Sequence, residues 1–197
     1  ARGEKVIAVS DCIREYILKQ YEAALKKFQS INDKESEANT LMKISGNLLV
    51  LGRRWQNGTL IYRERALEIY RNLGNREKES QTLYLIGGGY MGLLEDKKAL
   101  NYYKQSLNIS KEINDRMQES RALTQMGRIY FNRSNYTKAL ENFQNSLSID
   151  EELEYNQAIV HTLNHIGEIY MELGENQIAL EYLQKNLDYN HEMTNLF

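Results

Sequence analysis

Residues 81–107, QTLYLIGGGYMGLLEDKKALNYYKQSL, contain the pattern that decides the fold. Their first half has the spacing L-x2-I-G-x2-Y, and their second half continues with A-L-x2-Y-x3-L. The glycine of this pattern, Gly87, recurs as Gly127 and Gly167, which stand 40 residues apart and have similar neighbours. Self-similarity at a fixed period of this size is typical of supersecondary units that stack on one another. The sequence therefore predicts an all-α solenoid of antiparallel helical hairpins.

The apolar periodicity predicts a single repeat domain over residues 1–197. An N-terminal helix or half-repeat is expected at residues 5–31, where it caps the array. The expected helical hairpins cover residues 38–72, 78–112, 118–152 and 158–194. The chain contains 0 prolines, which suits uninterrupted helices. Pairs of Asn, Asp and Gly at 32–33, 74–75 and 114–115 are expected to form corners, because these residues tolerate the backbone angles of helix ends.

Small residues recur where two antiparallel helices are expected to cross. Gly87 and its two equivalents let the backbones approach, at a helix cost of about 1 kcal/mol relative to alanine. The first full hairpin departs from this rule. Ser45 stands in the glycine position, Arg63 stands in the position of the second-helix aromatic residue, and two extra residues lie between Gly52 and Leu60.

The residue composition restricts the class of partner and the cellular compartment. With 25 basic and 27 acidic residues the formal net charge is -2, so the sequence gives no electrostatic case for nucleic acid. No apolar run approaches the roughly 20 residues of a membrane helix, and no membrane partner is expected. The single cysteine, Cys12, cannot form an internal disulfide, which favours a reducing, cytoplasmic location. No cofactor motif is evident.

The pattern resembles the tetratricopeptide repeat, with leucine in the usual tryptophan position. The 40-residue spacing is similar to the longer variant in kinesin light chains, polarity adaptors and bacterial arrays, notably cyanobacterial ones. The resemblance covers residues 16–187. It implies a right-handed superhelix whose first helices line a concave groove that binds a peptide or a helix of a partner protein.

The resemblance also places particular side chains in that groove, where hairpin packing does not need them. The predicted partner-binding residues are Asn39, Tyr84, Gly88, Met91, Arg121, Thr124, Gln125, Arg128, Phe131, His161, Asn164, His165, Glu168 and Met171. The aromatic and methionine side chains among them are expected to take apolar anchors. The arginines and amides are expected to hold a peptide backbone or a carboxylate.

Other patterns admit a second interpretation. Residues 87–92 spell G-x-G-x-x-G, but they lie inside a predicted helix, whereas a dinucleotide fingerprint opens one after a strand. His161, His165 and Glu168 share one helical face and can in principle chelate zinc. Because the H-E-x-x-H motif is absent, we expect no metal and favour a polar groove wall that is sensitive to pH.

Two single residues carry weaker signals. Trp55, in the irregular stretch of the first hairpin, is either an exposed interaction residue or, as we favour, a side chain packed at the mouth of that hairpin. Cys12 is expected to be a small core residue, since no histidine lies near it in the sequence.

No nucleophile–base pair, metal cage or phosphate loop is evident, so the sequence predicts a non-catalytic protein-interaction module. The alternative is a regulatory or sensor arm of a larger enzyme, such as a peptidase, kinase or cyclase. The last helix is expected to expose Ile178, Tyr182, Leu183 and Tyr189 without a polar cap. This face predicts further repeats, a partner domain or self-association. The absence of an initiator methionine favours a processed chain or a fragment of a longer protein.

Overall fold

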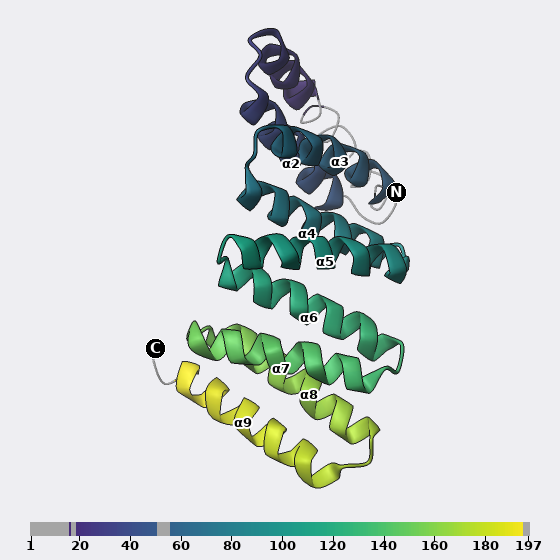
Figure 1. Ribbon diagram of the computed structural model, residues 1–197, viewed down its shortest axis with the longest axis vertical. Helices are drawn as coiled ribbons and strands as arrows, with labels where there is room; N and C mark the ends of the chain where they lie inside the picture. Colours follow the sequence, from purple (N-terminus) through teal and green to yellow (C-terminus); the bar gives the residue numbers. More distant parts are fainter. Residues whose placement is uncertain (1–15, 17–18, 51–55, 195–197) are drawn as a thin grey trace, which may run out of the picture. The chain divides into compact units, whose positions relative to one another are not determined.

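A computed structural model describes residue 16 and residues 19–50 and 56–194. The regular structure of these residues is entirely helical, and Figure 1 shows the helices α2 to α9 along the chain. Residues 5–15 of the predicted first helix lie outside the described residues, as do Cys12 and Trp55. By its internal contacts the chain divides into two units, Ala1–Leu93 and Leu94–Phe197.

The first unit contains helical residues 19–30 and the helices α2 (Lys34–Val50), α3 (Gln56–Asn72) and α4 (Arg76–Gly92). Helix α2 packs against α3, and α3 packs against α4. The core between α2 and α3 is formed by Ala38, Leu41, Ala66 and Tyr70, each at most 1% exposed. Leu25, from the helical residues that precede α2, also packs against this core.

The second unit contains α5 (Asp96–Glu112), α6 (Arg116–Asn132), α7 (Tyr136–Glu152), α8 (Asn156–Glu172) and α9 (Asn176–Thr194). Each helix packs against the next, and α6 also contacts α8. Phe143 and Ile166, both 0% exposed, belong to the core that joins α7 to α8. The predicted fold class is confirmed, because both units stack antiparallel helices in chain order as an α-solenoid does.

The crossing residues have the predicted packing roles. A Cβ atom on Gly127 would lie 2.8 Å from Cε1 of Phe143, so the helix backbone of α6 approaches the aromatic ring closely. In α4, the buried Gly89 also has a packing role that the sequence pattern does not reveal. A Cβ atom there would lie 2.6 Å from Cδ2 of Leu60 on α3.

The corners explain why the helices begin and end where they do. Asn32, Gly74 and Asn114 have left-handed φ angles of 54°, 67° and 57°, which end the preceding helix. The next residue then caps the following helix: the Asp115 side chain, for example, accepts a hydrogen bond of 3.0 Å from the backbone N–H of Gln118. Asp33 and Asn75 make the same contact, so the corners predicted at these three places are confirmed.

A buried carboxylate recurs near the start of the first helix of three repeats. Glu37, Glu79 and Glu119 are 4%, 5% and 7% exposed. Each pairs with a cation three residues earlier, for example Arg76 with Glu79 at 2.7 Å. Glu79 also pairs with Arg71 of the preceding helix at 2.9 Å, so the carboxylate ties two successive helices together. In the last repeat the equivalent residue is Ile159, which is 1% exposed and packs through apolar contact alone.

Candidate partner-binding site

The predicted groove residues of the second unit lie together on one face of α6 and α8. Arg121, Thr124, Gln125 and Arg128 follow one another at helical spacing on α6, and His161, Asn164, His165 and Glu168 do so on α8. Because the two helices contact each other and the two rows are equivalent, these eight residues form a single surface, here called the α6/α8 face. Arg121, Arg128 and His161 are exposed, and the other five are half-buried.

Hydrogen bonds fix several side chains on this face before any partner binds. Arg128 Nη1 donates to Gln125 Oε1 at 2.9 Å. Asn164 Nδ2 donates to Glu168 Oε1 at 2.9 Å, and His165 Nδ1 lies 3.1 Å from Glu168 Oε2. The His165 ring also stacks on Phe143 of α7, with 5.0 Å between ring centroids. These contacts hold the polar groups of the α6/α8 face in defined orientations.

The contacts of His165 and Glu168 also concern the zinc site that the sequence allows in principle. His165 and Glu168 engage each other, and the described residues contain no group of three or more His, Cys, Asp or Glu side chains arranged to hold an ion. Likewise, within that described part, no helix is both long and apolar enough to cross a bilayer.

Thr124 differs from the other predicted residues because its hydroxyl points inward. Thr124 Oγ1 lies 2.6 Å from Ser146 Oγ and 3.1 Å from the carbonyl oxygen of Ser120. Ser120 and Ser146 in turn hydrogen-bond to the carboxylate of Asp150, which is 1% exposed. Burial raises the pKa of Asp150, although these hydroxyls and the charge of Arg121 oppose the rise. Thr124 thus contributes mainly to a buried network beneath the α6/α8 face.

An apolar end adjoins the polar rows. Phe131 is half-buried at the end of α6, where its ring centroid lies 6.0 Å from that of Tyr136. Met171 holds the equivalent position on α8 and is 48% exposed. The two predicted apolar anchors of this unit therefore sit at matching places on neighbouring helices.

The first unit has a cavity on the corresponding side of α2 and α4. This α2/α4 pocket has a volume of about 420 Å³. It is lined by Asn39, Met42, Lys43, Tyr70, Lys78, Gln81, Thr82 and Leu85. Asn39 was predicted, and its Oδ1 accepts a hydrogen bond of 2.8 Å from the Tyr70 hydroxyl. The remaining predicted residues of this unit, Tyr84, Gly88 and Met91, are half-buried on α4 outside the pocket lining.

Sequence reasoning missed the two lysines of the α2/α4 pocket. Lys43 lies one helical turn after Asn39, and Lys78 one turn before Thr82, so helical spacing could have grouped them with the pocket.

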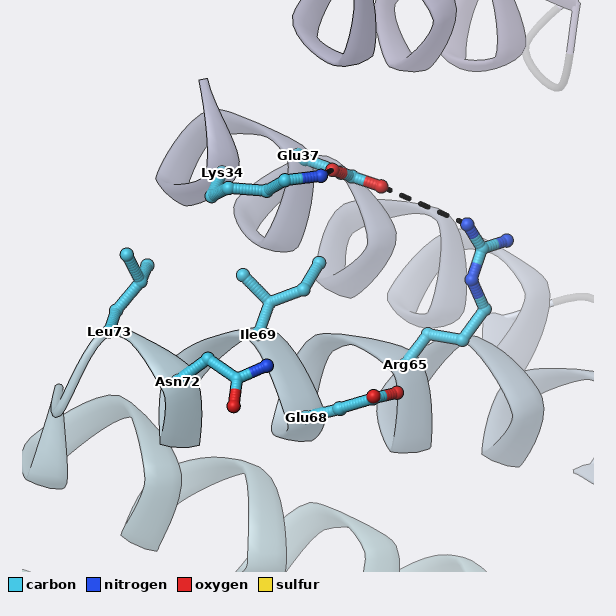
Figure 2. Close-up of a pocket in the computed structure, with 7 residues that line it drawn as sticks. All are labelled: Lys34, Glu37, Arg65, Glu68, Ile69, Asn72 and Leu73. Carbon is cyan, nitrogen blue, oxygen red and sulfur yellow. Dashed lines mark hydrogen bonds and ion pairs between the residues drawn. The ribbon is translucent and has the colours of Figure 1, made fainter. Parts of the chain in front are cut away.

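A second cavity of the first unit was not predicted at all. Figure 2 shows this α2/α3 pocket, which has a volume of about 370 Å³. It is lined by Lys34, Glu37, Arg65, Glu68, Ile69, Asn72 and Leu73. Lys34 Nζ lies 2.9 Å from Glu37 Oε2, and Arg65 Nη2 lies 3.9 Å from Glu37 Oε1. A buried carboxylate thus holds two cations at the edge of the cavity.

The predicted open face of α9 is only partly as expected. Ile178 is 36% exposed, and Tyr189 is half-buried. Leu183, in contrast, points toward α8, since its Cδ2 lies 3.1 Å from the place that a Cβ of Gly167 would occupy. Tyr182 stacks on Tyr170 with 5.6 Å between the ring centroids. Self-association through this face stays a prediction of the sequence.

Part of the sequence is similar to a known repeat family. Residues 118–189 match the sequence model of the tetratricopeptide repeat family. Over these residues the chain is similar to tetratricopeptide repeats. No curated protein sequence matches it.

Solved structures share the helical solenoid fold. Aspartyl phosphate phosphatase F from Bacillus subtilis has a TM-score of 0.81 at 20% identity, over 92% of this chain and 48% of that one. A Rap protein complexed with competence and sporulation factor has a TM-score of 0.73 at 19% identity, over 95% of this chain and 52% of that one. The chain therefore spans about half the length of both proteins.

A third similar structure belongs to a larger assembly of domains. It is the signal transduction ATPase with numerous domains from Pyrococcus horikoshii, which has a tetratricopeptide repeat sensor. Its TM-score is 0.73 at 19% identity, over 90% of this chain and 28% of that one. At these identities the three likenesses concern the fold alone.

Proposed function

We propose that the chain is a non-catalytic, cytoplasmic protein-interaction module that binds a peptide or a helix of a partner protein on the first helices of its repeats. The observation that carries the proposal is the α6/α8 face. There, accessible polar side chains from two successive first helices lie together in fixed orientations, and hairpin packing does not use most of them. The α2/α4 pocket is the corresponding binding surface of the first unit.

The chemistry of the α6/α8 face suits a short segment of protein. Arg128 is oriented by Gln125 and keeps further N–H groups for carbonyl or carboxylate oxygens, which arginine binds bidentately. Glu168 is held by Asn164 and His165 and accepts from backbone or side-chain donors. Met171 and Phe131 supply an apolar end for a hydrophobic anchor. The Rap protein structure in complex with competence and sporulation factor supports the idea that this architecture serves recognition.

A selection experiment tests the proposal. A random peptide library is selected on the immobilised wild-type chain, and the recovered peptides are measured against Arg128→Glu and Met171→Glu. We expect each variant to weaken binding by about tenfold or more, because one reverses a contact charge and the other introduces a charge at the apolar anchor.

The matched control is Arg133→Glu. Arg133 lies just after α6 and pairs with Asp96 at 3.7 Å. Its substitution therefore makes the same charge change as Arg128→Glu, but away from the α6/α8 face. Circular dichroism establishes that all variants are folded. Peptides that bind the two face variants and the control equally well would contradict the proposal.

A regulatory or sensor arm is the second candidate. It is favoured by the likeness to the Pyrococcus horikoshii protein, in which a tetratricopeptide repeat sensor accompanies other domains. Selected peptides that match a segment encoded in the same gene would support this form of the proposal, in which the partner is a neighbouring domain. Peptides that match only other proteins would favour the free-standing module.

A further inference from the structure

The α2/α3 pocket opens at a place that the α6–α7 hairpin closes with an ion pair. Lys34 and Arg116 are the first residues of α2 and α6, and Asn72 and Glu152 are the last residues of α3 and α7. In the second unit, Arg116 Nη2 binds Glu152 Oε2 at 2.7 Å and thereby joins the two ends. In the first unit Asn72 provides no carboxylate, and the corresponding space is the cavity of about 370 Å³.

The apolar floor of the pocket differs from the α6–α7 hairpin at Ile69, whereas Leu73 and its equivalent Leu153 are similarly exposed, at 46% and 41%. Ile149, beneath the closed end of α6–α7, is 4% exposed. Its equivalent on α3, Ile69, is only half-buried and lines the pocket together with Leu73. Figure 2 shows these two side chains and Asn72 across the cavity from Lys34 and Glu37.

The cationic edge is held in place by a buried anion. Glu37 is 4% exposed, and Gln29 Nε2 donates to its Oε1 at 2.8 Å. Burial opposes ionisation of Glu37, but the hydrogen bonds from Gln29 and Lys34 and the charges of Lys34 and Arg65 together lower its pKa. An ionised Glu37 therefore anchors both cations at the pocket.

The second unit shows that a cation in this position can take two carboxylates at once. Arg116 binds Glu119 at 2.8 Å and Glu152 at 2.7 Å. Lys34 contacts Glu37, the equivalent of Glu119, and the counterpart of Glu152 is absent. Arg65 reaches Glu37 only at 3.9 Å, which leaves its guanidinium suited to a second acceptor.

We propose that the α2/α3 pocket binds a small aliphatic monocarboxylate, with the carboxylate between Lys34 and Arg65 and the hydrocarbon chain on Ile69 and Leu73. The ligand supplies the group that Glu152 supplies internally in α6–α7. The cavity volume falls in the roughly 300–1,000 Å³ range of small-molecule sites. Glu68, exposed at the rim, disfavours a ligand with a second negative charge. This site is independent of the proposed partner-binding face.

A titration of the full chain tests the proposal, with hexanoate as the probe and hexanamide as its neutral analogue. Backbone amide signals are followed by two-dimensional NMR. We expect saturable shifts confined to residues around 34–37 and 65–73, with a dissociation constant of roughly millimolar order because the probe has few atoms. Hexanamide is expected to bind at least about fivefold more weakly, since it lacks the charge.

Two variants locate the site. Asn72→Glu supplies the internal carboxylate and is expected to abolish hexanoate binding. Asn132→Glu, the same change at the end of α6, is its control. The double variant Lys34→Gln and Arg65→Gln is expected to weaken binding about tenfold or more, whereas Lys104→Gln, exposed on α5, is not. Dispersed amide spectra verify that each variant is folded.

Three outcomes overturn the proposal. The first is the absence of saturable shifts at these residues, and the second is equal binding of hexanoate and hexanamide. The third is hexanoate binding that Asn72→Glu leaves unchanged. A further arm uses N-acetyl-glutamyl amide in place of hexanoate. If that probe binds the same residues about tenfold more tightly, the small-molecule assignment fails in favour of an acidic side chain of a partner.

Discussion

The α2–α3 and α6–α7 hairpins have their buried polar groups at different positions. In α2–α3 these groups lie at the helix crossing, and in α6–α7 they lie at a second set of facing positions. In α6–α7, Gly127 meets the ring of Phe143, which is 0% exposed. At the equivalent positions of α2–α3, Arg63 Nε donates to Ser45 Oγ at 3.3 Å, and Arg63 Nη1 donates to the carbonyl oxygen of Leu85 at 2.6 Å. A glycine–aromatic pair in one hairpin is therefore a serine–arginine pair in the other.

At the second set of facing positions, α2–α3 is apolar and α6–α7 is polar. The first hairpin has Ala38, Ala66 and Tyr70 in an apolar cluster. The α6–α7 hairpin has the hydrogen-bonded network of Ser120, Ser146 and Asp150 at the equivalent positions. The comparison shows that the repeat conserves the fit between facing side chains more strictly than it conserves their chemistry. Buried polar groups are accommodated wherever their partner changes with them.

The largest expected effect is on the apolar pair of α6–α7. Phe143→Ala should lower the free energy of unfolding of the second unit by about 3–5 kcal/mol, because it removes a fully buried ring from beside a glycine and leaves a cavity. Urea denaturation measures the loss, and hydrogen exchange of the α6 and α7 amides assigns it to this unit. A loss below about 1 kcal/mol would show that the ring is not essential to the packing.

The polar pair of α2–α3 should be the next most sensitive. Arg63→Met is expected to cost about 2–3 kcal/mol, because it leaves the Ser45 hydroxyl and the Leu85 carbonyl without this donor in a buried place. The double variant Ser45→Gly and Arg63→Phe recreates the pair of α6–α7 and should lose clearly less stability than the sum of the losses of Ser45→Gly and Arg63→Phe alone. Additive losses in this double-mutant cycle would refute the idea that the pair acts as a unit.

Substitutions of two glycines, one at a helix crossing and one on an exposed position, test the comparison further. Gly127→Ala should lose up to about 2 kcal/mol, because overpacking against Phe143 outweighs the helix propensity of alanine. Gly46→Ala, on an exposed position of α2 with no atom within 4 Å of the new Cβ, should gain about 0.5–1 kcal/mol. The shift in urea midpoint measures both. The same sign for the two variants would contradict the assignment of Gly127 to the helix crossing.

The smallest expected effect concerns the buried network of Ser120, Ser146 and Asp150 in α6–α7, and it depends on pH. Burial raises the pKa of Asp150 in the folded chain above its ordinary value of 3.8. The folded state therefore binds the proton more tightly than the unfolded state, and this contribution to stability is lost as pH rises through the folded pKa. Asp150→Asn should remove that loss.

Urea midpoints across an acidic-to-neutral pH series provide the measurement. Relative to wild type, Asp150→Asn should gain stability as pH rises, by about 1 kcal/mol or less at neutral pH. Glu151→Gln, the same change at an exposed neighbour, is the control. A wild-type profile that stays parallel to that of Asp150→Asn would contradict the role of the buried carboxylate.

The sequence predicts the helices and their corners because both depend on local signals. The recurrence of Gly87, Gly127 and Gly167 and the Asn, Asp and Gly residues of the corners can be recognised without knowing any distance. The residues of the α6/α8 face were predicted in a different way, because the resemblance to the tetratricopeptide repeat implies which positions of the first helices line a groove. Partner binding on this face stays a prediction.

The features that were missed depend on contacts between helices. Thr124 was expected on the surface, but Ser146 of α7 draws its hydroxyl inward. Gly89 packs against Leu60 of the preceding helix, which a pattern within one helix does not reveal. The α2/α3 pocket lies where Asn72 takes the place of Glu152, a difference that is recognised only when the facing residues Lys34 and Arg116 are compared.

The paired exchange at Ser45 and Arg63 also has a genetic consequence. Tandem repeats grow and shrink through unequal crossing-over between their coding segments. A crossover between the codons of Ser45 and Arg63 would combine the first helix of one repeat with the second helix of another. It would thereby place a buried arginine opposite glycine or a phenylalanine opposite serine. A crossover at a corner such as Gly74 or Asn114 keeps each pair together. The hairpin, and not the single helix, is therefore the segment that keeps such matched pairs together when the array grows or shrinks.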